Sequence, residues 1–390
     1  MGLATSRLGS SLLNAFSTLV LLRAVDANSY AGFASAMVLA LFLGSFANLG
    51  LEVLAMEAQA VKDDELVVRA SSVHLALQLS SMILTPLVAF VTGAYWVTAA
   101  LLVAFSIGER RMSFWNCCLV GMGRSGETVG SNFISRLPPF VVLGLPATTT
   151  PNTTTAVFAA LSLSGVALGS WRSRRRVGRL ASRLTLLDLR VIRRSRAYWT
   201  SSLGQQLRQL DLPLMSGVAS ANATSAFAPA SRLVGPMNLI PHSLGMAVFP
   251  RAAAGHHADV KRGLALGVAS VVPIWLTSLV LWAWGRPLFV TLIGTEYAST
   301  WPIICLMLAA IGLSVPGVVS LASLQGYGLR RFAAAFEWTS SLAYLTAIAV
   351  IAPLYGGLGA AWTLMAVSAA TAVIPTLRLA AYWRETHVGP

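Results

Sequence analysis

The sequence predicts an all-α membrane protein with about twelve transmembrane helices, arranged in two six-helix lobes around a central cavity. The first observation is composition: of the 390 residues 56% are hydrophobic and 11% are charged, and the mean hydropathy is +0.70. These values lie far from those of soluble globular proteins. The second observation is a series of apolar runs of about 20 residues, each long enough to cross a bilayer as a helix. The third is a weak internal repeat.

The individual spans follow from the apolar runs, which are continuous and not alternating. Lipid admits only helices and closed barrels, so continuous runs predict helices. The first run follows Arg7 and resembles a signal peptide, but the internal repeat requires it as a helix of the mature protein. In chain order the predicted spans are 8–25, 30–55, 70–92, 95–120, 128–146, 155–171, 197–219, 224–250, 264–284, 301–324, 331–350 and 357–377.

The net charge of +14 has a topological explanation. Most basic residues fall in alternate loops, above all in 172–196, whereas intervening loops such as "PATTTPNTTT" and "ASANATS" are almost uncharged. This is the positive-inside pattern. It predicts that both termini are cytoplasmic, and it argues against nucleic acid as a partner.

The sequence offers little for catalysis or for cofactors. Its three cysteines, Cys117, Cys118 and Cys305, all fall in apolar spans, so they indicate neither disulfides nor a zinc site. It has no nucleophile–His–acid set, paired carboxylates, phosphate loop or metal-ligand spacing. We therefore expect no enzyme activity, no cofactor and no metal.

An internal duplication relates the two halves of the chain. "YWVTAALLVAF" and "TWPIICLMLAA" carry Trp96 and Trp301, which are 205 positions apart. Each half holds six spans, an even number, so the repeats are predicted to be parallel, with a site between them. Further corresponding pairs are Gly121 and Gly326, Gly123 and Gly328, Leu49-Gly50 and Leu244-Gly245, Asn14 and Gln205, and Ser17 and Arg208.

The duplication divides the chain into three predicted parts. Residues 1–171 form the N-terminal lobe, 172–196 a basic cytoplasmic linker, and 197–390 the C-terminal lobe. The linker is either an amphipathic helix lying on anionic headgroups or a solvated segment whose charges fix topology.

Several of these residues also carry a family resemblance. The stretch "LLRAVDANSYAGFASAMVLALFLGSFANLGLEVLAMEA" resembles the opening two helices of polysaccharide and O-antigen flippases, which belong to the multidrug/oligosaccharidyl-lipid/polysaccharide exporter superfamily. Arg23, Tyr30, Gly32, Phe33 and Gly50 occupy the matching places. The stretch "LRQLDLPLMSG", with "AFAPASRLVGPMNLIPHSLGMAVFPRAA" after it, is similar to the seventh and eighth helices of that family.

The resemblance covers most of the chain and implies a function. Proteins of that family have two six-helix lobes around a cavity that opens alternately to either side of a bacterial cell membrane. The usual cargo is a polyprenyl-pyrophosphate-linked saccharide. Phe227 and Pro229 depart from the family pattern, which expects a Tyr and a small residue there.

Charged side chains inside the predicted spans are the candidate binding residues. An ionised side chain at mid-bilayer costs about 2.5–3.5 kcal/mol on insertion scales unless it faces water or a partner. Arginine suits a pyrophosphate cargo, because its planar fork of donors matches phosphate oxygens. The predicted substrate-binding residues are Arg208, Arg136, Arg232, Arg110, Arg111 and Gln205, of which Gln205 shares a polar helix stripe with Arg208 and Asp211.

Alternatives stand beside several of these assignments. Asp211 either pairs with Arg208 at i+3 or binds a coupling ion. Arg110 and Arg111 lie within the fourth helix if the repeat holds, and are otherwise loop charges. Arg136 and Arg232 can also reach the membrane interface, each with its side chain extended along its helix.

The sequence thus predicts a flippase for an anionic lipid-linked saccharide, working by alternating access in cell-surface polysaccharide biosynthesis. Its expected partners are the saccharide lipid, membrane lipids and a polysaccharide polymerase or another assembly protein. Two alternatives are a multidrug exporter of the same superfamily, whose cavity would be acidic, and a non-transporting scaffold of an assembly complex. The arginine excess favours the flippase.

Overall fold

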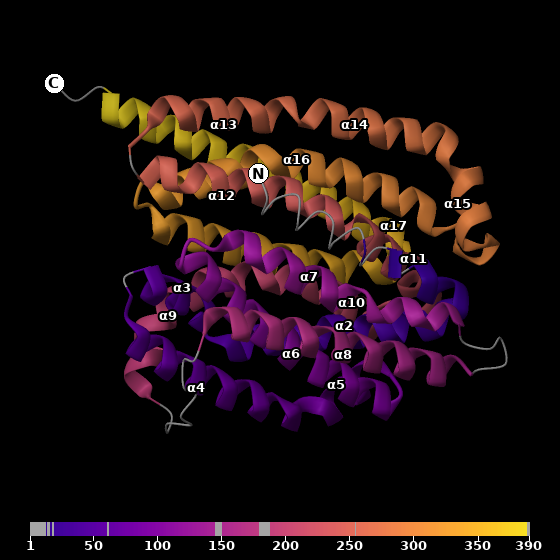
Figure 1. Ribbon diagram of the computed structural model, residues 1–390. Coiled ribbons are helices and arrows are strands. Elements are labelled where there is room, and N and C mark those ends of the chain that lie inside the picture. Colours follow the sequence, from indigo (N-terminus) through magenta and orange to yellow (C-terminus); the bar gives the residue numbers. More distant parts are fainter. Residues whose placement is uncertain are drawn as a thin grey trace. The chain divides into compact units, whose positions relative to one another are not determined.

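The chain is all-α, as predicted. The computed structural model describes residues 13, 16–17, 19–60, 62–144, 150–178, 188–253 and 255–387. Helix dominates these residues and no strand occurs among them. They belong to two compact units, Met1–Gly217 (unit 1) and Val218–Pro390 (unit 2). Within each unit the long helices run side by side (Figure 1).

The main helices follow one another along the chain with short connections. Unit 1 contains α2 (Ala27–Asn48), α3 (Leu51–Ala60), α4 (Asp64–Ser80), α5 (Thr85–Thr92), α6 (Trp96–Gly121), α7 (Thr128–Arg136), α8 (Pro151–Val177), α9 (Leu189–Leu207) and α10 (Asp211–Val218), which ends at the unit boundary. Unit 2 contains α11 (Ala221–Val234), α12 (Leu239–Ala253), α13 (His257–Ala269), α14 (Val271–Val280), α15 (Arg286–Ile293), α16 (Thr300–Gly326) and α17 (Arg330–His387).

The predicted spans coincide with helical segments from 30–55 onward. The last two spans are the two arms of α17, which meet at Gly356, where φ is 63°. The span 8–25 is described in part, at 13, 16–17 and 19–25, and these residues are helical up to Ala24. Helices of the described part that are long and apolar enough to cross a membrane are Ala27–Asn48, Asp64–Thr92, Pro151–Val177, His257–Thr291, Thr300–Gly326 and Arg331–Thr386.

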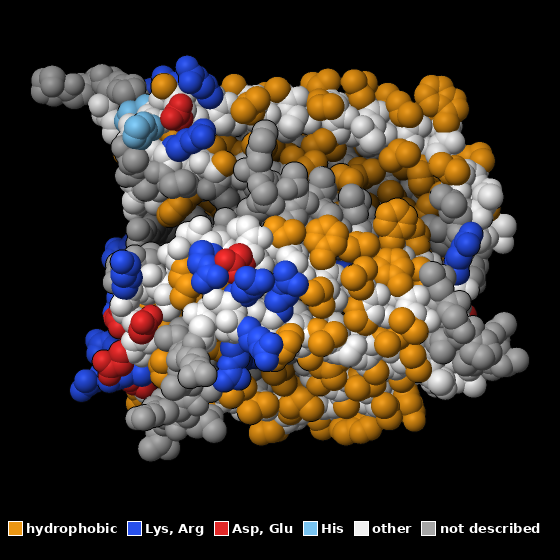
Figure 2. All heavy atoms as spheres, viewed as in Figure 1, with side chains coloured by type: hydrophobic (Ala, Val, Ile, Leu, Met, Phe, Trp, Pro, Cys, Tyr) orange, Lys and Arg blue, Asp and Glu red, His pale blue; other side chains and the backbone are white. Residues whose placement is uncertain are grey.

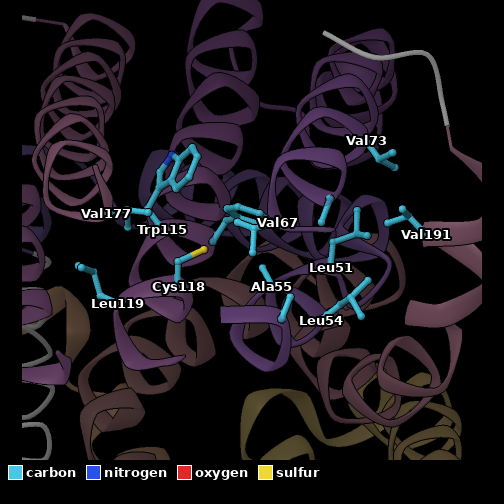
Figure 3. Close-up of a cluster of buried hydrophobic side chains, with 13 residues drawn as sticks. Leu51, Leu54, Ala55, Val67, Val73, Trp115, Cys118, Leu119, Val177 and Val191 are labelled. Atoms are coloured by element: carbon cyan, nitrogen blue, oxygen red, sulfur yellow. The ribbon is translucent and has the colours of Figure 1, made fainter. Parts of the chain in front are cut away.

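Helix α6 is the centre of unit 1, where it packs against α8, α3 and α2. One end of α6 lies in an apolar cluster that also draws on α3, α4, α8 and α9. That cluster contains Trp115 and Cys118 of α6 together with Leu51 and Ala55 of α3 (Figure 3). The cluster fixes the rotation of α6 about its axis, so it also fixes which neighbour each charged side chain of α6 reaches.

The second predicted span is broken into two helices. Helix α2 begins at a cap, where Asp26 Oδ1 accepts from the amides of Asn28 and Ser29 and the hydrogen bonds from Ser29 lower the pKa of Asp26. It ends at Asn48, because Leu49 and Gly50 both adopt positive φ, of 48° and 74°. A positive φ ends an α-helix, so α3 starts afresh at Leu51.

Helix α16 has the same central place in unit 2 that α6 has in unit 1. It packs against α17, α12, α11 and α14, and it continues through Pro316. Trp96 lies at the start of α6, and Trp301 at the start of α16. The two helices are therefore corresponding elements of the duplicated halves.

The turns that end α6 and α16 match bond for bond, which confirms the predicted correspondence there. Gly123 and Gly328 both have positive φ, of 74° and 89°. After α6 the amides of Met122, Gly123 and Arg124 donate to the carbonyls of Cys118, Val120 and Leu119. After α16 the amides of Tyr327, Gly328 and Leu329 donate to Ser323, Gln325 and Leu324, each 205 positions later. The pair Leu49-Gly50 and Leu244-Gly245 differs, because α12 continues through Gly245.

The predicted linker 172–196 overlaps the end of α8 and the start of α9. Residues 179–187 lie outside the described part, and with them most of the proposed amphipathic helix. Helix α9 packs against α2, α3 and α4 of unit 1. The boundaries 1–171 and 197–390 stay a prediction about the lobes.

Candidate functional site

Three consecutive charges lie in the middle of a helix, on α6. Glu109, Arg110 and Arg111 occupy a helix that runs without a break from Trp96 to Gly121. They are therefore helix residues and not loop charges, as the repeat required. Successive residues of a helix point about 100° apart, so the three side chains reach three different neighbours.

Arg110 reaches toward α2 and α9 and keeps unused donors. Its Nη2 lies 3.5 Å from the carbonyl oxygen of Leu41 and 3.4 Å from Oε1 of Gln206. Both distances are at the long end of hydrogen bonding. Its Nε is buried and has no partner among the described residues. A guanidinium has five N–H donors, so this one can take a further acceptor.

A glycine makes room for this side chain. Helices α2 and α6 approach closely at Gly44, where Ser106 Oγ donates to the carbonyl oxygen of Ala40 at 2.7 Å. A Cβ at Gly44 would clash with Ser106 Oγ and would lie 3.5 Å from Cγ of Arg110. The approach of the two helices thus sets the path of the arginine.

Arg111 points instead toward α4, where its donors are well used. Its Nη1 donates to the carbonyl oxygen of Ser71 at 3.0 Å and lies 3.3 Å from Nδ1 of His74, and its Nη2 lies 3.3 Å from Ser71 Oγ. The guanidinium also lies 5.5 Å and 5.0 Å from the ring centroids of Phe114 and Trp115. Arg111 therefore holds α4 to α6.

The same contact fixes the form of a buried histidine. Arginine can only donate, so Nδ1 of His74 accepts from Arg111 and the ring is neutral, with its hydrogen on Nε2. His74 is fully buried. Its Nε2 has no partner among the described residues.

Glu109 forms an ion pair with Arg136 across α6 and α7. Arg136 Nη2 lies 2.6 Å from Glu109 Oε1, and each side chain is 21% exposed. Glu109 thus neutralises Arg136, one of the predicted substrate-binding residues.

Glu52 of α3 is a buried carboxylate that was not among the predicted site residues. Its Oε2 accepts from Ser113 Oγ at 2.6 Å, and its Oε1 has no partner among the described residues. The sequence held one signal for it, a single carboxylate directly after the "LGL" of the second span.

The predicted polar stripe of the seventh span lies on an interrupted helix. Helix α9 ends at Leu207, a 3₁₀ turn covers Arg208–Leu210, and α10 begins at Asp211. Pro213 explains the interruption, because its ring lacks an N–H and crowds the carbonyl four residues earlier. Asp211 Oδ1 accepts from the amide of Leu212 at 2.7 Å.

The structure describes only part of the predicted polar stripe. The 3₁₀ turn keeps i and i+3 on one side, so Arg208 and Asp211 share a face, and their direct pairing stays a prediction. The side chain of Gln205 lies outside the described part. Its neighbour Gln206 is the one that contacts Arg110, and sequence reasoning missed it.

Arg232 belongs to unit 2. It lies half-buried in the last turn of α11, a helix that continues through Pro229 with Phe227 fully buried. The family departure at these two positions is therefore compatible with an unbroken helix.

Unit 1 brings Arg110, Arg111 and Arg136 together around α6.

The charge of α6 has no counterpart on α16. At the 205-residue offset, Ser314, Val315 and Pro316 stand where Glu109, Arg110 and Arg111 stand in unit 1. The two corresponding helices thus differ in charge at their centres. No group of three or more His, Cys, Asp and Glu that could hold a metal ion occurs within the described residues.

Comparisons with known proteins agree with the fold. No protein-family model matches the chain, and no curated protein matches its sequence. Solved structures do match. "Lipid II flippase MurJ, inward closed conformation" has a TM-score of 0.70 at 14% identity, over 98% of this chain and 87% of the other.

Two further matches are MATE transporters. An inward-facing multidrug resistance MATE family transporter of the MOP superfamily has a TM-score of 0.70 at 12% identity, over 98% of this chain and 99% of the other. The Vibrio cholerae MATE transporter VcmN in its bent form has a TM-score of 0.59 at 14% identity, over 99% of both chains. The chain therefore has the fold of MOP-superfamily transporters.

Proposed function

We propose that this protein is a flippase that moves a polyprenyl-pyrophosphate-linked oligosaccharide from the cytoplasmic to the outer leaflet of a bacterial cell membrane. It would do so by alternating access, with both termini in the cytoplasm, and would serve cell-surface polysaccharide biosynthesis. Its fold is that of transporters, and one of the similar structures is a lipid II flippase. A polysaccharide polymerase that receives the product is the expected protein partner.

The observation that carries this proposal is the state of Arg110. It is a half-buried arginine in the middle of a membrane helix, with long hydrogen bonds and a buried, unused Nε. An intramembrane arginine is costly unless it meets a counter-charge or water. A diphosphate that arrives from the lipid surface supplies this charge in the two-point geometry that a guanidinium fits. Arg208, Arg232, Arg136 and Gln205 stay candidate contacts for the same cargo, with Asp211 as a structural or coupling residue.

The test is a flipping assay on the purified protein in proteoliposomes, with a fluorescent polyprenyl-pyrophosphate-linked saccharide. We expect Arg110→Gln to slow flipping by about tenfold or more, because charge-assisted hydrogen bonds are worth about 1.5–3 kcal/mol. Arg110→Lys keeps the charge but loses the two-point donor geometry, so its flipping rate should lie between those of the wild type and of Arg110→Gln. Arg262→Gln is the matched control, because that side chain is 81% exposed on α13. Flipping by Arg110→Gln at the wild-type rate would refute the mechanism.

One observation favours a second candidate, a multidrug exporter. Glu52 is a buried carboxylate with one oxygen unpartnered among the described residues, and such a group suits a cationic drug. Two of the similar structures are MATE transporters, and one of these is a multidrug resistance transporter. Drug susceptibility of a deletion strain separates the candidates. A flippase mutant loses surface polysaccharide at unchanged susceptibility to cationic dyes, and an exporter mutant does the reverse.

A further inference from the structure

Arg172 of α8 is an arginine for which the described chain supplies no acceptor. It lies half-buried against α7, with neither a hydrogen bond nor an ion pair to any described residue, and its Nε is fully buried. A Cβ built on Gly130 of α7 would lie 2.7 Å from Cζ of Arg172 and 3.0 Å from its Nε. The guanidinium is therefore seated on the backbone of α7 in space that only glycine leaves. A half-buried guanidinium without an acceptor is costly unless something outside the chain supplies one.

The polar groups around Arg172 are already engaged with one another. Ser173 Oγ donates to Asn116 Oδ1 at 2.7 Å and lies 2.8 Å from Ser131 Oγ, and Asn116 Nδ2 donates to Asn132 Oδ1 at 3.1 Å. This network ties α6, α7 and α8 together and leaves Arg172 out. None of these polar groups accepts a hydrogen bond from Arg172.

The charge around Arg172 is strongly positive. The carboxylate of Glu127 forms ion pairs with two other arginines of this region, at 2.7 Å from Arg124 and 3.8 Å from Arg176. Arg175 lies 4.2 Å from the ring centroid of Trp171, which is 55% exposed. Basic side chains gather beside the apolar surface over α7 and α8 (Figure 2). An anion is the partner that this field favours.

The surface next to the guanidinium is apolar and exposed on both helices. Leu168 precedes Arg172 by one turn of α8 and is 51% exposed. Phe133 and the C-cap residue Leu137 lie on the same face of α7 as Gly130, at i+3 and i+7. Their side chains are 37% and 53% exposed. Arg172 itself lies about 7.5 Å along the axis from Val177, the last residue of α8. A headgroup at Arg172 would thus have its acyl chains beside these three apolar side chains.

We propose that Arg172 and Gly130 form a binding site for the phosphate of an anionic glycerophospholipid, on the membrane-facing side of α7 and α8. Arg172 donates to the phosphate oxygens, whereas Arg175 contacts the ring of Trp171 and lies outside the site. Phe133, Leu137 and Leu168 contact the acyl chains. The site binds a lipid of the surrounding leaflet, and it is independent of whether the protein transports a saccharide.

The experiment is native mass spectrometry of the purified full chain in detergent, titrated with dioleoyl-phosphatidylglycerol and, in parallel, with dioleoyl-phosphatidylcholine. We expect tighter binding of the anionic lipid to the wild type, and a Kd at least about tenfold weaker for Arg172→Gln. Gly130→Ala keeps every charge but displaces the guanidinium, so it should weaken binding similarly. Arg175→Gln is the matched control, one turn away and exposed, and should change the Kd by less than about twofold.

Three results would overturn the site. Equal weakening by Arg172→Gln and Arg175→Gln would mean that diffuse positive charge binds the lipid. If inorganic phosphate protected the protein from thermal unfolding as well as phosphatidylglycerol does, the site would bind a free anion and not a lipid. Unchanged lipid binding by a folded Arg172→Gln would mean that the arginine has no role. Should that variant fail to fold, Arg172→Lys and Gly130→Ala carry the same comparison.

Discussion

At the scale of single residues, one turn of α6 distributes three charges to three kinds of partner. Glu109 takes a counter-ion, Arg136, from α7. Arg111 contacts a carbonyl, a hydroxyl and a histidine of α4 and two aromatic rings of its own helix. Arg110 makes two long hydrogen bonds and keeps N–H donors that are free to bind a further acceptor. The helix fixes the directions of the three side chains. Arg110 is the best suited to bind an external anion, because its neighbours offer the fewest acceptors.

The Glu109–Arg136 pair should be a stabilising element of unit 1. Removal of one partner leaves a partly buried charge alone, so we expect Glu109→Gln or Arg136→Gln to lower the free energy of unfolding by about 1–3 kcal/mol each. The double variant should lose less than the sum, because it leaves no lone charge. Thermal unfolding of the purified protein in detergent measures all three. Additive losses in the double variant would show that the two side chains are not coupled.

Sequence reasoning found the charged residues but not their orientations. The position of Arg110 within a helix followed from the repeat, and the Arg111 contacts could not be predicted because they depend on the rotation of α6. Glu52 was missed because one carboxylate in an apolar run has no period to mark it. Gln206 was missed because the polar stripe pointed to Gln205, one residue earlier.

At the scale of elements, the turns after α6 and α16 show how the duplication is retained where the backbone demands it. Both turns need a positive φ to end the helix, and glycine adopts it without steric cost. The rest of the two sequences has diverged, including the charges at the centres of the helices. The repeat is therefore marked by Gly123 and Gly328 at the turns and by Trp96 and Trp301 at the helix starts, whereas the pair Gly50 and Gly245 does not mark it.

Substitution of these two glycines tests their role. Gly123→Ala and Gly328→Ala should each lower the free energy of unfolding by about 1 kcal/mol, because alanine is strained at positive φ. A Cβ at either site would meet no atom within 4 Å, so the loss would report strain and not a clash. Gly126→Ala is the control, since that glycine also has open space but no positive φ. Chemical denaturation or thermal unfolding in detergent is the measurement, and equal stability of all three variants would contradict the argument.

The predicted spans fell on helical segments, but the interruptions within them were largely beyond sequence reasoning. The break at Leu49-Gly50 depends on a non-glycine residue in a left-handed conformation. The 3₁₀ turn at Arg208–Leu210 is explained by Pro213, yet many prolines bend helices without breaking them, as α16 shows at Pro316. A π-helical turn at Leu281–Gly285 left no recognisable pattern in the sequence.

At the scale of the whole molecule, the distribution of charge predicts the orientation in the membrane. Six helical segments of the described part are long and apolar enough to cross a bilayer, and the chain holds 28 basic and 14 acidic residues. Basic residues cluster at the end of α8 and the start of α9, whereas the segment before α8 is uncharged. Positive loops are retained in the cytoplasm during insertion, so the two ends of α8 should lie on opposite sides.

Reporter fusions in a bacterial host test this orientation. Alkaline phosphatase fused after Asn152 should be active, because that end of α8 is expected outside. The same enzyme fused after Arg194 or at the C-terminus should be inactive, and green fluorescent protein at those two sites should fluoresce. The fusion at Arg194 is the internal control, because it reports the opposite end of α8 from the Asn152 fusion. Phosphatase activity at the C-terminus would mean an odd number of crossings after α8, which is incompatible with two parallel six-helix repeats.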